Sequence, residues 1–316
     1  MYRNKSIAVV VPAYNEELLI LRVLETMPDF VDRVIVVDDY STDRTQHLVE
    51  EFCHKDGGRA ELIRHEQNQG VGAAIVTGYK RAIAHQADIT AVMAGDAQMD
   101  PDDLPALLDP VVEDEVDYSK GNRLLTGDAW KIIPKPRYIG NSVLSLLTKI
   151  ASGYWHLADS QTGYTAASLK VLTTLDLNRI RKTYGMPNDL LVRLNVFGFR
   201  ARDVVVRPIY NIGEKSGIRI GRVVFSMSFL LLRLFVFRLK ERYVIRDFHP
   251  LVFFYVFAFL LFLVDIPLTA RVGYVLWNTG EIPPINFLTS IFVTTMGVMF
   301  LLFAMWFDMD YNKDLK

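Results

Sequence analysis

Short apolar runs and amphipathic stretches alternate along the first two thirds of the chain. The apolar runs have the length of buried strands and occupy residues 6–11, 34–37, 60–65 and 89–93. Between them, apolar positions recur at helical intervals over residues 16–27, 43–52 and 70–85. This alternation predicts an α/β fold in which crossover helices connect a doubly wound parallel sheet. In such a sheet, ligands bind beyond the carboxyl ends of the strands.

Two long uncharged stretches dominate the C-terminal part of the chain. Phe248 to Val264 contains no Asp, Glu, Lys or Arg and can extend toward Trp277, and Ile282 to Phe307 is uncharged throughout. Because a membrane-spanning helix needs roughly 20 residues, we predict a transmembrane hairpin with helices at about 248–270 and 283–307. Asp265, Pro267 and Arg271 would then lie where the first helix reaches the far interface. The alternative is a pair of buried core helices.

The segment that precedes the hairpin is apolar but interrupted by arginines. Its uncharged run, Val223 to Leu232, is too short to cross a bilayer. An amphipathic helix in the headgroup layer accounts for both residue types, and a surface helix packed on the preceding domain is the alternative. We therefore predict three parts: an α/β domain at 1–217, interfacial helices at 218–246 and the hairpin with a short tail at 247–316.

Charge and cysteine content narrow the possible partners and the location. The 316-residue chain has a net charge of −1, which gives no argument for nucleic-acid binding. Cys53 is the one cysteine, so an internal disulfide is excluded. Basic residues cluster just before the first apolar stretch, and we find no signal peptide pattern. By the positive-inside rule, the α/β domain is expected in the cytoplasm, and self-association through so small a hairpin is plausible.

Polar residues that suit a nucleotide follow the first two predicted strands. Tyr14 offers a ring to a base or ribose, and Glu16 offers acceptors to ribose hydroxyls. Asp38 and Asp39 are adjacent carboxylates that can bind the N–H edge of a nucleobase. The alternative is that these turns only cap helices, through Asn15 in the first turn and through Ser41 or Thr42 in the second.

Asp96 and Gln98 follow the strand at 89–93. A diphosphate leaving group needs a divalent cation, and oxygen ligands suit Mg²⁺ or Mn²⁺, so both residues are candidate metal ligands. The alternative is an acidic loop that caps a helix beginning at Pro101. Gly70 and Gly72 precede a helix, where they either let backbone N–H groups approach phosphate or permit tight packing.

Together these motifs resemble the GT-A-fold, family 2 glycosyltransferases, particularly the polyprenyl (dolichyl) phosphate hexose synthases. The resemblance covers about residues 7–217 and depends on short motifs at 11–17, 37–43, 68–74, 95–98, 121–123 and 159–164. It implies a GT-A doubly wound mixed sheet with helices on both faces. Three positions depart from the family's usual motifs: Ala94 in the metal turn, Tyr40 in place of a glycine, and Thr165 in place of a basic residue. Tyr40 would make a positive φ costly.

The resemblance also implies roles for individual residues. The nucleotide sugar would be held by Pro12, Tyr14, Glu16, Asp39, Gly70 and Asp96, and the metal by Asp96 and Gln98. The acceptor phosphate would be bound by Arg123, Arg137 and Lys215. Asp96 and Asp189 are the candidate catalytic residues, with Asp189 near the reacting sugar.

The predicted function is transfer of a hexose, with inversion, from a UDP- or GDP-hexose to a polyprenyl phosphate at the membrane. Two alternatives stay open. One is a glycosyltransferase that extends a lipid-linked saccharide. The other is a non-catalytic membrane protein that binds nucleotide sugars, which Ala94 favours. A processive polysaccharide synthase is disfavoured because its Gln-x-x-Arg-Trp element is not visible in this sequence.

Overall fold

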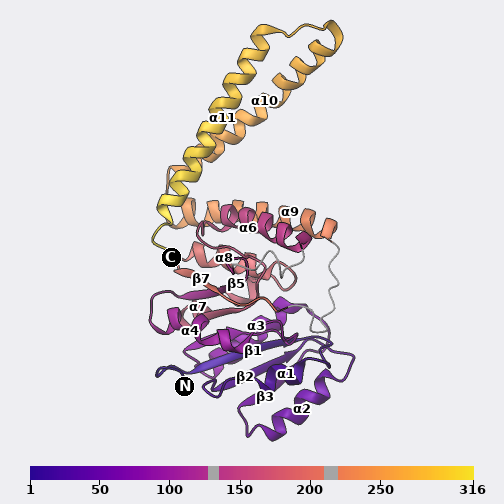
Figure 1. The fold of residues 1–316 in the computed structure, drawn as a ribbon. Coiled ribbons are helices and arrows are strands. Elements are labelled where there is room, and N and C mark those ends of the chain that lie inside the picture. The colour runs from indigo at the N-terminus through magenta and orange to yellow at the C-terminus, as the bar shows by residue number, and fades with distance from the viewer. Residues whose placement is uncertain (127–134, 210–219) are drawn as a thin grey trace. The chain divides into compact units, whose positions relative to one another are not determined.

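The computed structural model describes residues 1–126, 135–209 and 220–316, which Figure 1 draws as a ribbon. They form two compact units. Unit 1 comprises Met1–Phe235 together with Leu315 and Lys316, and unit 2 comprises Val236–Asp314. The predicted domain boundary at 217/218 lies outside the described residues.

A seven-stranded sheet lies at the centre of unit 1, in the order β3-β2-β1-β4-β6-β5-β7. The strands are β1 (Ile7–Ala13), β2 (Arg33–Asp38), β3 (Ala60–Arg64), β4 (Ile89–Val92), β5 (Tyr118–Asn122), β6 (Thr165–Ser168) and β7 (Ala201–Val205). β6 runs antiparallel to both of its neighbours, β4 and β5, whereas the other pairs are parallel. The sheet is therefore mixed, as the resemblance implied, and the parallel arrangement predicted from the first four strands is confirmed for β1 to β4. The long connection between β5 and β6 lets β6 return in the opposite direction between β4 and β5.

Helices cover both faces of this sheet (Figure 1). They are α1 (Ile20–Glu25), α2 (Thr45–Lys55), α3 (Val71–Ala84), η1 (Pro101–Asp103), α4 (Leu104–Val112), α6 (Lys135–Ser152), α7 (Leu169–Thr174), η2 (Leu177–Arg179) and α8 (Met186–Val196). Because strand side chains alternate between faces, β1 contributes to two cores. Val9 and Val11 pack with residues of α1, α2 and α4, while Ala8 and Val10 pack with residues of α3 and α8. Every residue of β1 is buried, which explains its uninterrupted apolar sequence.

The helix α9 (Ile220–Lys240) belongs to unit 1 as far as Phe235, and this part has two different apolar faces. Met227 and Leu231 are buried against Leu144 and Ala151 of α6. Phe229 and Leu232 are 67% and 60% exposed. α9 therefore packs on the domain, as the surface-helix alternative expected, and also keeps the exposed apolar side that an interfacial helix requires.

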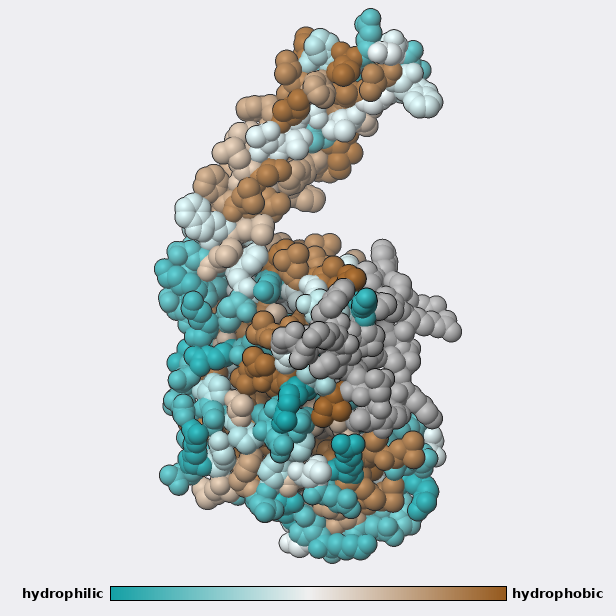
Figure 2. Space-filling model, viewed as in Figure 1, coloured by the Kyte–Doolittle hydropathy of each residue, from teal (hydrophilic) through white to brown (hydrophobic). Residues whose placement is uncertain are grey.

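Unit 2 contains a π-helical turn, η3 (Glu241–Arg246), and the long helices α10 (Leu251–Thr279) and α11 (Pro284–Tyr311). Both long helices are sufficiently long and apolar to span a membrane. Hydrophobic residues cover much of the surface of the two helices in Figure 2, whereas hydrophilic and hydrophobic residues are mixed on the lower part of unit 1. α10 continues past residue 270 to Thr279, in line with the expected extension toward Trp277. Apolar residues such as Val272 and Val275 continue the helix past Pro267, so Asp265 lies at the middle of α10.

A buried polar cluster joins the end of α9 to the end of α11 within unit 2. Arg238 and Asp308 are both fully buried and form a bidentate ion pair, with N–O distances of 2.7 and 2.9 Å. Asn312 donates to the Tyr243 hydroxyl at 2.7 Å, and that hydroxyl donates to Asp308. These bonds satisfy the buried charges, since a buried ion pair needs additional hydrogen bonds to be tolerated.

Candidate functional site

Two turns that follow β1 and β2 are tied to each other by hydrogen bonds. The backbone N–H of Asn15 donates to Ser41 Oγ (2.9 Å), and that of Glu16 donates to Thr45 Oγ1 (2.8 Å). The Asn15 side chain accepts from the N–H of Thr42 at 2.8 Å. Asn15, Ser41 and Thr42 therefore connect the two turns, and the helix-capping alternative was wrong for them. The same bonds explain why α1 begins only at Ile20.

Tyr40 has a φ of +68°, in the left-handed region where its family counterpart is a glycine. This conformation costs a residue with a Cβ about 1–2 kcal/mol. The Arg64 guanidinium lies 5.6 Å from the centre of the Tyr40 ring. A cation–π contact at an exposed site recovers about 0.5–1 kcal/mol, so the substitution is partly compensated.

Asp39 supports the loop that precedes α3. Its carboxylate accepts from the backbone N–H groups of Gln69 (2.8 Å) and Gly70 (2.7 Å), and it lies 2.7 Å from the Nδ1 of His65. The other ring nitrogen of His65 lies 2.9 Å from Thr77 Oγ1. The side chain of Asp39 is 3% exposed, and its oxygens already have protein partners. Asp39 therefore holds a wall of the site in place.

The two glycines at the start of α3 pack closely against the segment at 181–183. Gly70 has a φ of +94°, and a Cβ there would lie 2.7 Å from the carbonyl oxygen of Lys182. A Cβ on Gly72 would lie 2.3 Å from the carbonyl oxygen of Arg181. The tight-packing alternative is thus correct for both glycines, and Gly70 in addition lines a cavity.

That cavity, called here the first cavity, has a volume of about 460 Å³ and is formed by the turns at the strand ends. Its lining includes the predicted residues Pro12, Tyr14, Glu16, Asp39, Gly70 and Asp96. Tyr14 lines this cavity and is 47% exposed to solvent. Burial, together with the nearby carboxylates of Asp96 and Asp43, raises the pKa of Glu16 to about 7. The first cavity thus concentrates negative charge that a cation or a hydrogen-bond donor would relieve.

A second cavity of about 340 Å³ shares part of its wall with the first. Its lining includes Asp96, Gln98, Arg123, Gln161, Tyr184 and Arg207. Ala94 and Asp96 line both cavities, so the two spaces meet at the turn that follows β4. The carboxylate of Asp96 therefore lies where the first and second cavities meet.

The residues predicted to hold a metal, Asp96 and Gln98, both line the second cavity. Asp96 Oδ1 accepts from the N–H of Gln98 at 3.1 Å, across Ala97, whose φ is +55°. The Gln98 Nε2 atom is buried and has no hydrogen-bond partner among the described residues. Ala94 contributes no ligand, and the described part of the chain holds no group of three His, Cys, Asp or Glu arranged for a metal. The capping alternative was wrong for Asp96, since Asp100 caps η1 instead.

Arg123 lines the second cavity and is held by a buried carboxylate. Its Nε and Nη2 atoms donate to Asp159 at 2.8 and 2.9 Å, and Asp159 is fully buried. Burial raises the pKa of Asp159, but the hydrogen bonds and charge of Arg123 outweigh burial and leave this pKa below its usual value. The buried Lys120 pairs with Asp203 at 2.9 Å and donates to the Asp159 carbonyl at 3.1 Å, which supports the same loop.

Asp189 is a predicted catalytic residue that lies apart from the two cavities. The Asp189 carboxylate is 3% exposed and accepts from the Arg181 N–H (2.7 Å) and from Arg193 Nε (3.0 Å). It lines neither cavity. The side chain of Arg137 and the whole of Lys215 lie outside the described part of the chain.

Three cavity residues were not predicted. The Tyr184 hydroxyl donates to Gln161 Oε1 at 2.9 Å, and Gln161 lies inside the 159–164 motif of the family resemblance. Arg207 follows β7 and forms ion pairs with Asp100 (3.1 Å) and Asp103 (3.2 Å). Its position just after a strand was the one signal that could have identified it.

Comparisons with known proteins agree with this geometry. Residues 8–175 match the model of glycosyl transferase family 2. The chain belongs to this family. It is 30% identical to the UDP-N-acetylglucosamine–dolichyl-phosphate N-acetylglucosaminyltransferase of Methanococcus voltae, over 72% of this chain and 96% of that one. It is 26% identical to the polyprenol monophosphomannose synthase of Mycolicibacterium smegmatis, over 70% of this chain and 84% of that one.

Among solved structures, the chain resembles glucosyl-3-phosphoglycerate synthase from Mycobacterium tuberculosis in complex with uridine diphosphate. The TM-score is 0.53 at 23% identity, over 74% of this chain and 80% of that one. At this identity the likeness shows the fold alone. The chain is therefore a family 2 glycosyltransferase with the GT-A fold.

Proposed function

We propose that this family 2 glycosyltransferase is membrane-bound and transfers a hexose, with inversion, from a UDP- or GDP-hexose to a polyprenyl phosphate. The observation that carries the proposal is the place of Asp96, in the shared wall of a carboxylate-rich cavity and a cavity that contains Arg123. The activities named for the Methanococcus and Mycolicibacterium relatives support a polyprenyl phosphate acceptor.

In this proposal the first cavity holds the nucleotide. Tyr14 stacks on the base or ribose, and Glu16 accepts from ribose hydroxyls. Asp39 would shape the nucleotide site indirectly. Its carboxylate fixes the backbone N–H groups of Gln69 and Gly70, and thereby the loop that lines the cavity. The diphosphate would then extend toward Asp96, and the hexose would enter the second cavity.

The residues present fit a divalent cation at the junction of the cavities. Asp96 offers a carboxylate, Gln98 offers a side-chain carbonyl, and burial together with the carboxylates of Asp96 and Asp43 raises the pKa of Glu16, which a nearby cation would reverse. Asp96 and the Gln98 side-chain oxygen would hold Mg²⁺ or Mn²⁺, with phosphate oxygens and water as the other ligands. When bound, the cation would neutralise charge that develops on the departing diphosphate.

Arg123 would orient the acceptor phosphate in the second cavity. One oxygen of this phosphate attacks the anomeric carbon, the bond from that carbon to the diphosphate oxygen breaks, and the nucleoside diphosphate departs. A phosphate monoester is already anionic at neutral pH, so the reaction needs positioning more than a strong base. Asp189 would act as a positioning residue because it holds the Arg181 backbone, just before the 183–187 segment that lines the cavity. We also propose that Arg137 and Lys215 contact the acceptor phosphate, and this proposal depends on the family resemblance alone.

The acceptor explains why such a site would need a membrane anchor. We propose that α10 and α11 span the bilayer, that the exposed apolar side of α9 lies in the headgroup layer, and that the catalytic domain is cytoplasmic. Residues 1–217, 218–246 and 247–316 would form the catalytic, interfacial and membrane-spanning parts. A polyprenyl phosphate keeps its phosphate at headgroup depth, where a membrane-bound enzyme can reach it.

The test is a substrate panel for the full-length protein in detergent. Radiolabelled UDP- and GDP-hexoses are each offered with a polyprenyl phosphate and a divalent cation, and the label in the lipid extract is counted. We expect one nucleotide class to give a labelled lipid whose anomeric configuration, measured by NMR, is opposite to that of the donor.

Two results would replace this proposal. Label that enters only a lipid-linked saccharide acceptor would identify a chain-extending enzyme. Nucleotide-sugar binding in isothermal titration without turnover on any acceptor would identify a binding protein.

A further inference from the structure

The helix α6 exposes apolar residues along one side. Ile139, Val143 and Leu146 are each more than half exposed to solvent. Positions i, i+4 and i+7 lie on one face of a helix, so these three side chains form one apolar stripe. Leu144 and Ala151, on the other side of α6, are buried. An exposed apolar surface of this kind marks an interaction site.

The helix α9 packs beside α6 and enlarges this apolar surface. Met227 and Leu231 of α9 are buried against α6, whereas Phe229 and Leu232 are exposed. Figure 1 shows α6 and α9 side by side at one end of unit 1, and Figure 2 shows hydrophobic residues where α9 lies. The exposed apolar residues of the two helices, called here the α6–α9 face, are Ile139, Val143, Leu146, Phe229 and Leu232.

The charge of these helices indicates what covers the α6–α9 face. Neither the 18 residues of α6 nor the 21 residues of α9 include Asp or Glu, although the whole chain has 36 of them. Lys135 of α6 and Arg233 of α9 are exposed, and helical spacing places each beside the apolar residues of its helix. An apolar face bordered by basic side chains is typical of helices that lie on anionic lipid. The face is therefore suited to a bilayer surface.

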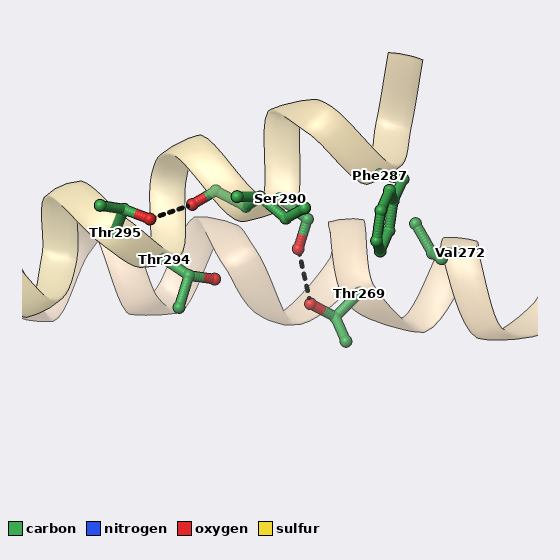
Figure 3. A pocket seen from close by; sticks show the side chains of 7 residues that line it. Thr269, Val272, Phe287, Ser290, Thr294 and Thr295 are labelled. Carbon is green, nitrogen blue, oxygen red and sulfur yellow. Dashed lines mark hydrogen bonds between the residues drawn. The ribbon is translucent and has the colours of Figure 1, made fainter. Parts of the chain in front are cut away.

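The hairpin that follows α9 brings a bilayer within reach of this face. Residues 241–250 separate α9 from α10, and a segment of this length spans at most about 35 Å. Polar groups of the hairpin are paired with each other. Ser290 Oγ donates to Asp265 at 2.6 Å, and the hydroxyls of Thr269 and Ser290 are 2.9 Å apart (Figure 3). Helices that span a membrane must satisfy their polar groups internally in this way.

The inner side of α6 supports the second cavity. The backbone N–H of Ser160 donates to Ser145 Oγ of α6 at 3.2 Å, and the residues that follow Ser160 line that cavity. The side chain of Asn188 donates to Thr148 Oγ1 of α6 at 2.7 Å, and the residues that precede Asn188 line it as well. α6 therefore holds two segments of the cavity wall.

The inner side of α9 supports the same wall. Gly185 lines the second cavity, and a Cβ there would lie 2.6 Å from the side chain of Leu230 in α9. This close packing places α9 directly behind the cavity wall. Both helices thus contact the domain on one side and expose the α6–α9 face on the other.

We propose that the α6–α9 face is a membrane-binding surface of the catalytic domain and lies in the headgroup layer of an anionic bilayer. The inference rests on the proposed membrane anchor and extends the interfacial part of the protein from α9 to α6. One helix layer, about 10 Å thick, separates the face from the wall of the second cavity. Docking of the face therefore holds this cavity near the headgroup layer, where a lipid phosphate can enter it while the lipid tails stay in the bilayer.

The experiment measures the depth of single nitroxide labels in the full-length protein, embedded in vesicles that contain anionic lipid. Cys53 is the one cysteine, so Cys53→Ser provides a background for Val143→Cys and Leu146→Cys. Power saturation compares accessibility to oxygen, which concentrates in lipid, with accessibility to a nickel chelate, which stays in water. Both labels should lie about 5–10 Å into the boundary between headgroups and acyl chains, where oxygen has the greater access.

Two further labels serve as controls in the same background. Leu18 is also an exposed leucine of unit 1, but it precedes α1 and lies outside the α6–α9 face. A label at Leu18→Cys should be accessible mainly to the nickel chelate. Phe259 is exposed on α10, and a label at Phe259→Cys should lie in hydrocarbon.

Labels at Val143 and Leu146 that behave like the Leu18 label would overturn the proposal. Labels that are protected from both reagents, even when lipid dilutes the protein, would also overturn it, because a protein would then cover the face. A Phe259 label in water would refute the proposed membrane anchor itself, whereas a Phe259 label in hydrocarbon with the other two in water would contradict this inference alone. The measurement requires no turnover, so a failure of the proposed glycosyl transfer would leave it unaffected.

Discussion

The two cavities that meet at Asp96 are built in opposite ways. Turns tied by backbone hydrogen bonds form the first, and Glu16 and Asp96 bring like charges together there. Long side chains form much of the second, where the charge of Arg123 is balanced by the buried Asp159. The first cavity therefore contains electrostatic repulsion that a ligand can relieve, whereas the second contains a compensated ion pair.

This difference predicts opposite relations between stability and activity. Removing the carboxylate of Glu16 or Asp96 from the first cavity relieves repulsion, so activity should fall without a loss of stability. Removing Arg123 from the second leaves a buried charge without its partner, so both should fall. Activity and thermal unfolding measured on the same variants can therefore confirm or refute the contrast.

The largest effect is expected for Asp96→Ala. If Asp96 holds the cation that supports diphosphate departure, transfer should fall about 10³-fold, which corresponds to about 4 kcal/mol of transition-state stabilisation. The melting temperature without ligand should be equal to that of wild type or slightly higher. Turnover and differential scanning fluorimetry measure the two quantities.

Asp29→Ala serves as the control, because Asp29 is exposed and lines neither cavity. It should leave both quantities unchanged. Full activity of Asp96→Ala would remove the basis for a metal at the junction.

Arg123→Ala should have the next largest effect. We expect kcat/KM for the lipid acceptor to fall about 10²-fold, while the nucleotide Kd stays within about twofold. Loss of the partner of Asp159 should cost about 3 kcal/mol, which lowers the melting temperature by about 5–10 °C. Initial rates at varied acceptor, nucleotide titration and thermal unfolding test these three points.

A second substitution separates the effect of Arg123 on stability from its effect on transfer. Adding Asp159→Asn to Arg123→Ala removes the uncompensated carboxylate, so the melting temperature should recover in part while transfer stays low. If nucleotide binding falls instead of acceptor use, Arg123 belongs to the donor side.

Features that depend on local sequence were predicted well. The strands β1, β2 and β4 are mainly apolar, and the polar residues just after them gather at one sheet edge because parallel strands end there together. Thus Pro12, Tyr14, Glu16, Asp39 and Asp96 could be grouped from spacing and family motifs.

Features that depend on distant contacts could not be predicted in this way. The direction of the Asp189 carboxylate is determined by the Arg181 backbone and by Arg193, which no motif indicates. The antiparallel insertion of β6 depends on a long connection rather than on the apolar pattern of the strand. Asp265 suggested a helix end because a charge is costly in lipid, whereas hydroxyls from α11 make it tolerable at mid-helix.

The smallest expected effect concerns Glu16, whose pKa is raised to about 7 by burial and then by Asp96 and Asp43. A carboxyl whose pKa is higher in the folded state loses stabilisation as pH rises through that value. Because Glu16 is only partly buried, screening reduces the effect to about 1 kcal/mol. Without divalent cations, Glu16→Gln should therefore raise the melting temperature by about 2–4 °C at pH 8.5 and by much less at pH 5.5. Asp96→Asn should shrink this gain, since it removes one source of repulsion. Equal shifts at both pH values would show that Glu16 does not share the charge of the first cavity.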